Sequence, residues 1–462
     1  MDQQNHLIRP RLTDYYGIHK SQSELDFAIQ FLDEDLPLYF DPFLLWKSPS
    51  QQDQALHTSI INSFNHLNYL IKKNLSNEAI SILLNLSECN EVGLGLSKSR
   101  SGARIGKGLA NDILSLFTNI PIYSQFGFTH FETIQLYVSG ISKDRVSDIS
   151  CNYLKSFLID YTIEQCQLLG IPIEETSIDL IYNYRSHKFD VDQKVSLPIN
   201  PKTNSPLIFT PKRWLRFNPW INFEDYFTSY IPKDDSINPN DLQDRVHVLM
   251  YNRDNYDQVE SYIDYKQQHA NDCKNDPLFT QIPVLSAKRK LADIVKLKTG
   301  KDDGADSQYE DYAAALLATL LYPHLDFAQT QSRTESGKHI RDMIFYNNRS
   351  VDFLDEIYTD YGNRQIIIEM KNVRQVERDH INQLNRYLQN GFGNFGIILT
   401  RNPLPKAIFQ NTIDLWSSQR KCLIALTDND LQLMTNIYES KQRSPIDVLK
   451  KKLIEFRRSC PS

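Results

Sequence analysis

The chain has 462 residues, of which 41% are hydrophobic and 11% aromatic, enough to build the cores of two or three domains. No stretch approaches the roughly 18 consecutive apolar residues that a membrane-spanning helix needs, so membrane proteins of that type are excluded. The net charge of −6 gives no global positive field, so any binding of nucleic acid must use local basic clusters.

Cysteine usage and the N-terminal sequence indicate the compartment. The first residues, Met1 to His6, are polar and lack the apolar segment of a signal peptide. The cysteines are scattered and form no Cys-x-x-Cys pair, which predicts a reduced, cytoplasmic protein without a zinc site. They are Cys89, Cys151, Cys166, Cys273, Cys422 and Cys460.

Three regions follow one another along the chain. Residues 1–240 are predicted to form a larger, mixed but mostly helical region, with helical periodicity from about Gln54 to Leu86 and from about Ile149 to Leu169. Residues 241–304 are polar and helical in pattern and are interpreted as a connector. Residues 305–462 alternate helical and strand patterns, so the overall fold class is α/β (α+β over the whole chain).

A glycine-rich segment lies within the first region, at residues 91–108. It holds five of the sixteen glycines of the chain and leads into a predicted helix from about Gly108 to Phe117. Such a loop before a helix can hold phosphate, and its basic residues are candidates for binding nucleic acid. The segment matches no named phosphate-binding motif, so a surface loop or a close-packed turn stays an open alternative. The basic candidates are Lys98, Arg100, Arg104 and Lys107.

The last region has a defined order of predicted elements. A helix from Tyr309 to Leu321 carries Glu310 in its first turn, and a strand over His339–Tyr346 carries Asp342 among apolar neighbours. An amphipathic segment and the strand Gln365–Lys371 come next. A helix from about 376 to 388 and a strand over residues 395–400, interpreted as the last strand of the core, complete the order.

The most informative motif stands at the end of the strand Gln365–Lys371. Side chains alternate along a strand, so Glu369 and Lys371 share one face and Met370 lies on the other. The preceding run of isoleucines predicts a buried strand, where unpaired charges are costly. With Asp342 on a neighbouring strand, the two carboxylates can hold a hard cation beside the lysine. The alternative is a surface strand with a cross-strand salt bridge, which the apolar run and the upstream Asp342 disfavour.

Asp342, Glu369-x-Lys371 and the helix–strand order around them resemble the PD-(D/E)XK nucleases, a family that includes many restriction endonucleases. The resemblance covers about the last third of the chain and implies a restriction-endonuclease-like mixed sheet flanked by helices. The proline of the family's motif is absent, because Arg341 precedes Asp342. That position varies widely in the family.

The resemblance implies a role for each site residue. Asp342 and Glu369 would bind Mg²⁺ or Mn²⁺, with the Met370 carbonyl as a further ligand, and Lys371 would orient the attacking water. Glu310 would bind a second metal or a metal-bound water. An ordinary acidic residue near a helix N-terminus is an equal alternative for Glu310. Gln383, on the helix after the catalytic strand, would contact the water or the phosphate, or else lie in solvent.

The expected function is therefore a Mg²⁺-dependent endonuclease that hydrolyses DNA, with RNA left open as a substrate. A prokaryotic restriction-type or anti-phage defence system is the expected setting, in which residues 1–240 supply recognition or control. The alternative is a catalytically silent nuclease fold that binds nucleic acid or protein within a larger defence complex. Homo-oligomers and a partner defence protein are possible partners, whereas a membrane is not.

Overall fold

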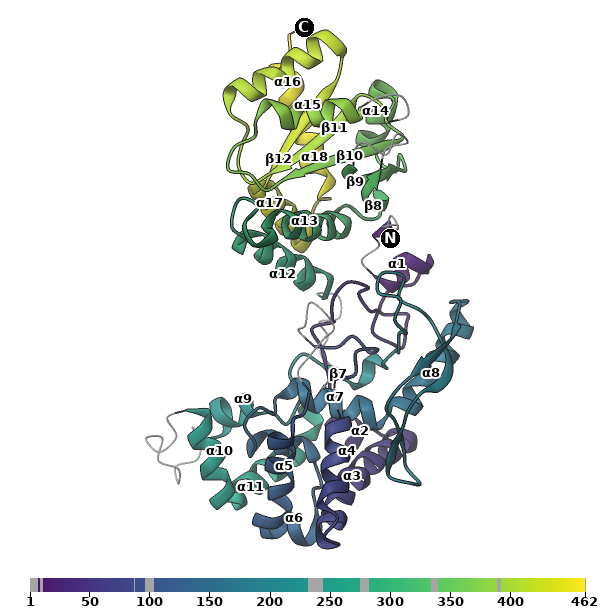
Figure 1. Ribbon diagram of the computed structural model, residues 1–462, viewed down its shortest axis with the longest axis vertical. Helices are drawn as coiled ribbons and strands as arrows, with labels where there is room; N and C mark the ends of the chain where they lie inside the picture. Colours follow the sequence, from purple (N-terminus) through teal and green to yellow (C-terminus); the bar gives the residue numbers. More distant parts are fainter. Residues whose placement is uncertain are drawn as a thin grey trace. The chain divides into compact units, whose positions relative to one another are not determined.

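The computed structural model describes residues 7–8, 11–86, 88–95, 104–231, 244–274, 282–333, 340–388 and 392–461. The chain divides into two compact units, one of residues 11–279 and one that joins residues 1–10 to 280–462 (Figure 1). This division differs from the predicted one, because residues 241–304 form no unit of their own. Their first part belongs to the N-terminal unit and their last part to the C-terminal unit.

The N-terminal unit is mostly helical, as the sequence predicts. Its helices are α1 (Leu12–Tyr16), α2 (Pro42–Trp46), α3 (Gln51–Lys72), α4 (Ser76–Asn85), α5 (Lys107–Asn119), α6 (Pro121–Phe126), α7 (Lys143–Tyr153), α8 (Lys155–Leu169), α9 (Phe223–Asp225), α10 (Arg245–Asp254) and α11 (Tyr256–Gln268). Short antiparallel pairs join β2 (Tyr39–Phe40) to β7 (Leu215–Arg216), β3 (Glu174–Ile178) to β6 (Gln193–Leu197), and β4 (Ile181–Asn183) to β5 (Lys188–Asp190).

The C-terminal unit is a helix-flanked sheet. Its strands are β1 (Leu7–Ile8), β8 (Leu325–Arg333), β9 (Ile340–Asn347), β10 (Gln365–Lys371), β11 (Phe395–Thr400) and β12 (Cys422–Thr427). Its helices are α12 (Ile282–Lys296), α13 (Ala305–Leu321), α14 (Asp352–Tyr361), α15 (Arg378–Tyr387), α16 (Lys406–Gln419), α17 (Asp428–Ser440) and α18 (Ile446–Ser459). Among the described residues no helix is long and apolar enough to cross a membrane.

The strands follow the order β1-β8-β9-β10-β11-β12, and β10 is central. β1, β8, β9 and β10 pair antiparallel, whereas β10, β11 and β12 pair parallel. The predicted mixed sheet flanked by helices is thus confirmed. The prediction that residues 395–400 form the last strand is wrong, because β12 pairs alongside them and continues the sheet.

Each face of the sheet packs on its own core, which explains why β10 is apolar throughout. Ile366, Ile368 and Met370 join one core with residues of α13, α14, α17 and α18. Ile367 joins the other core, with the apolar residues of α15. A strand covered on both faces reads as a continuous apolar run rather than as an alternating one.

Candidate active site

Asp342, Glu369 and Lys371 meet where β9 and β10 stop pairing. The register of these antiparallel strands ends at Ile368 opposite Met343, so Asp342 and Glu369 are the next residues on the two strands. Glu369 and Lys371 alternate with Met370, which lies in the opposite core, as the strand periodicity predicts. Lys371 Nζ lies 2.6 Å from Glu369 Oε1 and 3.4 Å from Asp342 Oδ2.

The backbone of Met370 fixes the Asp342 carboxylate. The Met370 N–H donates a hydrogen bond of 2.7 Å to Asp342 Oδ2. This bond takes the place of a backbone hydrogen bond between β9 and β10, whose pairing ends at Ile368. The N–H and C=O of one strand residue face the same neighbouring strand, so the Met370 carbonyl faces the same edge as Asp342. The sequence-based prediction of this carbonyl as an extra metal ligand is compatible with that orientation.

Burial dominates the electrostatics of the three side chains, which are 11%, 0% and 16% exposed for Asp342, Glu369 and Lys371. Burial, and then the nearby charge of Asp342, raises the pKa of Glu369 to about 8. Burial also raises the pKa of Asp342, against the opposing effect of Lys371. Burial opposes the charged form of Lys371, but the charges of Asp342 and Glu369 outweigh it and raise the pKa of this ammonium.

The two carboxylates fit a divalent cation that prefers oxygen ligands. Glu369 Oε2 is buried and has no hydrogen-bond partner among the described residues, so a lone pair in the interior is left without a donor. In the described ranges no three His, Cys, Asp or Glu side chains come together as a metal site. Mg²⁺ usually takes only one or two protein carboxylates and completes its shell with water and substrate phosphate, so two suffice.

Glu310, on α13, lies within electrostatic reach of this group. Burial, and then the charge of Asp342, raises the pKa of Glu310 to about 7, and Lys371 opposes the shift. Within the described part of the chain, the Glu310 side chain makes no hydrogen bond or ion pair. An acid that interacts electrostatically with Asp342 and Glu369 is suited to a second cation or to an ordered water.

Gln383 and two residues that the sequence did not single out lie on α15, next to the same group. The Gln383 side-chain amide donates a hydrogen bond of 3.0 Å to the Tyr387 hydroxyl. Burial raises the pKa of Tyr387, and the charges of Glu369 and Asp342 add to that effect. Burial, and then the charge of Lys371, lowers the pKa of His380. A helical spacing of three to four residues places these polar groups on one side of α15.

Asn372 is a further residue whose role the sequence did not reveal. It is buried directly after Lys371, and its side-chain amide donates to the carbonyls of Lys298 and Gly300, at 2.9 and 2.8 Å. Arg401 donates to Asn372 Oδ1 at 3.4 Å and pairs with Asp428 at 2.7 Å. A buried asparagine directly after an apolar strand was the available signal, because such a side chain must find partners.

The predicted nucleic-acid residues of the glycine-rich segment are only partly described. Arg104 and Lys107 are exposed, and Lys107 begins α5, close to the predicted start of that helix. Lys98 and Arg100 lie outside the described residues.

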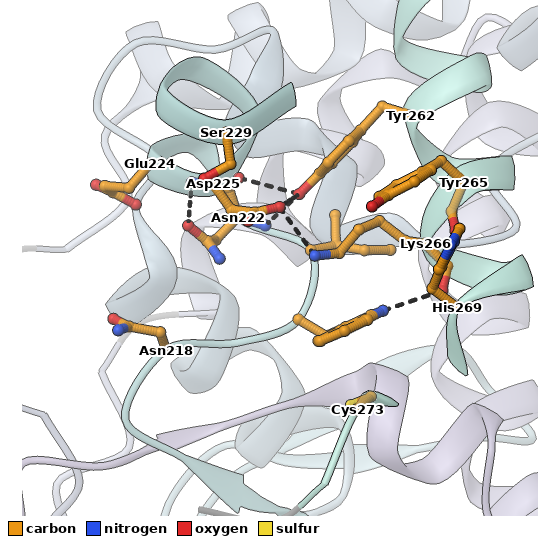
Figure 2. Close-up of polar contacts among 12 residues, drawn as sticks. Asn218, Asn222, Glu224, Asp225, Ser229, Tyr262, Tyr265, Lys266, His269 and Cys273 are labelled. Atoms are coloured by element: carbon orange, nitrogen blue, oxygen red, sulfur yellow. Dashed lines mark hydrogen bonds and ion pairs between the residues drawn. The ribbon is translucent and has the colours of Figure 1, made fainter. Parts of the chain in front are cut away.

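A second lysine–carboxylate cluster lies in the N-terminal unit and serves for comparison; its Lys266 is buried, whereas its Asp225 side chain is 33% exposed. Asp225 Oδ2 accepts hydrogen bonds from Tyr262 and from Lys266, each at 2.8 Å (Figure 2). The Lys266 ammonium also lies 3.8 Å from the centre of the Trp220 ring, a cation–π contact. None of the buried side-chain polar atoms of Asp225, Tyr262 or Lys266 lacks a partner.

Comparison with known proteins gives one match. Residues 17–222 are similar to a family described as Domain of unknown function (DUF8370). No curated protein and no solved structure matches the chain. The match lies within the N-terminal unit and does not reach Asp342, Glu369 or Lys371.

Proposed function

We propose that the C-terminal unit is a metal-dependent endonuclease that resembles the PD-(D/E)XK nucleases and hydrolyses phosphodiester bonds of DNA. The observation that carries the proposal is the convergence of Asp342, Glu369 and Lys371 at the end of a buried strand, with Glu369 Oε2 buried and lacking a hydrogen-bond partner among the described residues. A buried carboxylate without a donor is costly in a structural role and useful in a cation site.

Each residue of the site has a distinct role in the proposed reaction. Asp342, held by the Met370 N–H, and Glu369, held on the central strand, would bind Mg²⁺ or Mn²⁺ together with the Met370 carbonyl. When bound, the cation would polarise the scissile phosphate and lower the pKa of a water. Lys371 would orient the attacking water and stabilise negative charge on the phosphate in the transition state.

Two further residues support this chemistry. Glu310 would hold a second cation or a metal-bound water, since it is partly buried and the charge of Asp342 acts on it. Gln383, hydrogen-bonded to Tyr387, would contact the attacking water or a phosphate oxygen from the α15 side. Both residues act through position, so their replacement should lower the rate less than the loss of Lys371 does.

A cleavage assay tests the proposal. The purified full chain is incubated with plasmid DNA and Mg²⁺, and in parallel with Mg²⁺ plus an excess of chelator. The wild type should cut the plasmid with Mg²⁺ but not with Mg²⁺ plus chelator. The Lys371→Ala variant should remain folded and leave the plasmid intact. Asp352→Ala is the matched control, because Asp352 is an exposed acid at the start of α14.

The outcomes separate the two candidate functions. If the Lys371→Ala variant still cuts plasmid DNA, the assignment of the active site is wrong. A folded wild type that binds DNA or a partner but never cuts would favour the alternative, a silent nuclease fold within a larger complex. An RNA substrate in the same assay decides between the two nucleic acids.

We infer a setting for the two units from the same considerations. A free nuclease is harmful to its own cell, so the N-terminal unit would supply recognition or control in a restriction-type or anti-phage defence system. All six cysteines are unpaired, which supports a reduced, cytoplasmic environment. A second copy of the chain or a partner defence protein would be the natural trigger for activation.

A further inference from the structure

The catalytic strand is tied to a loop that no motif identified. Residues 297–304, here called the anchored loop, connect α12 to α13. The Gly300 N–H donates to the Asn372 carbonyl at 3.0 Å, and the Asn372 amide donates back to the carbonyls of Lys298 and Gly300. Gly300 adopts φ +120°, a conformation that side-chain-bearing residues rarely take.

This anchoring places two lysines close to the candidate active site. Asn372 directly follows Lys371, so the backbone of the anchored loop lies one residue from the catalytic lysine. Lys298 and Lys301 are exposed. Burial and the charge of Lys371 lower the pKa of His380 on α15, and the charge of Lys301 lowers it further. Lys301 and Lys371 therefore both act electrostatically on the same side chain.

Neither lysine is engaged by a strong partner. Within the described residues, the ion pair of Lys298 is with Asp303 at 3.9 Å, and the two side chains are 79% and 88% exposed. Such a pair contributes about 0–1 kcal/mol in water, so another anion can easily replace the Asp303 carboxylate at Lys298. In the same ranges the side chain of Lys301 makes no hydrogen bond or ion pair, so both ammonium groups are available to an incoming ligand.

We propose that the anchored loop binds the nucleic-acid backbone next to the scissile phosphate, through Lys298 and Lys301, with Asn372 as its positioning residue. The proposal rests on the proposed nuclease function and names where that substrate lies. A ligand with closely spaced phosphates matches two exposed ammonium groups three residues apart, whereas the carboxylates beyond them need a cation before phosphate approaches. The contact is to phosphate and carries no sequence preference.

The test measures binding of a fluorescently labelled DNA duplex to the full chain. Binding is measured in the Glu369→Gln background, which removes one of the two carboxylates that would repel phosphate and which should not cut the DNA. Adding Lys298→Ala and Lys301→Ala should weaken binding about ten-fold and lower the salt dependence by about one unit of slope per lysine. Asp303→Asn, which releases Lys298, should tighten binding about two-fold, a change of opposite sign.

The matched control is Lys450→Ala with Lys451→Ala, two exposed lysines of α18, a helix that packs on the sheet face opposite Glu369. Lys451 has a comparable surface ion pair, with Glu455 at 3.7 Å. This control should leave affinity and salt slope unchanged. If the anchored-loop variants behave like the control, the inference is wrong.

Cleavage kinetics separate this inference from the proposed function. With Glu369 intact, the Lys298 and Lys301 replacements should raise KM about ten-fold and leave kcat within about two-fold. A wild type that cuts DNA together with loop variants of unchanged KM overturns the loop contact alone. A wild type that binds DNA through these lysines but never cuts supports the loop and overturns the nuclease.

Discussion

The two units each bury a lysine beside carboxylate, and the two clusters differ in how fully their polar atoms are satisfied. In the N-terminal unit, one carboxylate, Asp225, accepts hydrogen bonds from one lysine and one tyrosine (Figure 2). The Lys266 ammonium also makes a cation–π contact with Trp220. In the C-terminal unit, two carboxylates share Lys371, and Glu369 Oε2 has no hydrogen-bond partner among the described residues.

This difference distinguishes a structural ion pair from a functional site. A structural pair balances its charge and satisfies its atoms, because unpaired buried groups cost free energy. The cluster at Lys371 holds more carboxyl groups than ammonium groups. Burial, and then the charge of Asp342, raises the pKa values of Glu369 and Glu310 to about 8 and 7. An imbalance of this kind marks a functional site more often than a structural one.

The largest effect we expect is on cleavage. Lys371→Ala or Glu369→Gln should lower the cleavage rate by about 100- to 10,000-fold, because each removes a group that acts on the reacting water or its cation. Asp342→Asn should do the same, whereas Asp352→Ala should cut at the wild-type rate. Initial rates on plasmid DNA measure this, and full activity in Asp342→Asn with loss in Asp352→Ala would mean that the strand is misassigned.

The reciprocal change in the N-terminal unit should affect stability instead. Lys266→Met removes the charged partner of Asp225 and leaves Tyr262 in place. It should lower the free energy of unfolding of this unit by about 1–3 kcal/mol, since a hydrogen-bonded charged group is lost. The cleavage rate per folded molecule should not change. Denaturant unfolding with a matched activity assay measures both, and a stable but inactive Lys266→Met variant would contradict the structural role.

The third effect is a dependence of stability on pH in metal-free protein. Glu369 has a pKa of about 8 when folded, against about 4.5 in an unfolded chain. Between these values the folded state binds more protons, so wild-type stability falls as pH rises from 4.5 to 8. Glu369→Gln removes this slope and should be more stable than wild type by about 1–3 kcal/mol at pH 8.5.

The gain from Glu369→Gln should vanish below about pH 3.5, where Glu369 is neutral in both the folded and the unfolded state. Thermal unfolding with chelator, measured across this pH window, gives the two curves. A Glu369→Gln variant that is less stable than wild type at high pH would mean that the Lys371 contact outweighs burial.

The smallest effect concerns the glycine-rich segment. Replacing Arg104 and Lys107, both exposed, by alanine should weaken DNA binding about two- to ten-fold and reduce the salt slope by about one unit per charge. The companion change of Lys98 and Arg100 should add to it. Fluorescence anisotropy at several salt concentrations measures the slope, and an unchanged slope would assign the segment to a structural or protein-contact role.

Strong, local signals made much of the C-terminal fold predictable. The isoleucine run of β10, the strand over residues 395–400 and the periodicity of α13 and α15 are encoded in short windows. β8 was missed because Gln329, Thr330 and Gln331 interrupt its apolar pattern, and β1 because a two-residue strand has no pattern. β12, the apolar run from Cys422 to Thr427, does carry a local strand pattern.

The candidate site was predictable only where its residues share one strand. Alternation along β10 placed Glu369 and Lys371 on one face, and an apolar context pointed to Asp342 on β9. The contributions of Asn372, His380 and Tyr387 depend on how a loop and a helix pack against the end of that strand. No local sequence pattern encodes this packing, because it is set by tertiary contacts between distant segments.

Metal-induced stabilisation tests the central claim most directly. The thermal midpoint of the full chain is measured with chelator and with increasing Mg²⁺ or Mn²⁺, for the wild type, Glu369→Gln and Lys266→Met. Binding to the folded state raises stability by mass action, so the wild type and Lys266→Met should gain with metal and Glu369→Gln should not. An equal gain in Glu369→Gln, or no gain in the wild type, would contradict a cation site at Asp342 and Glu369.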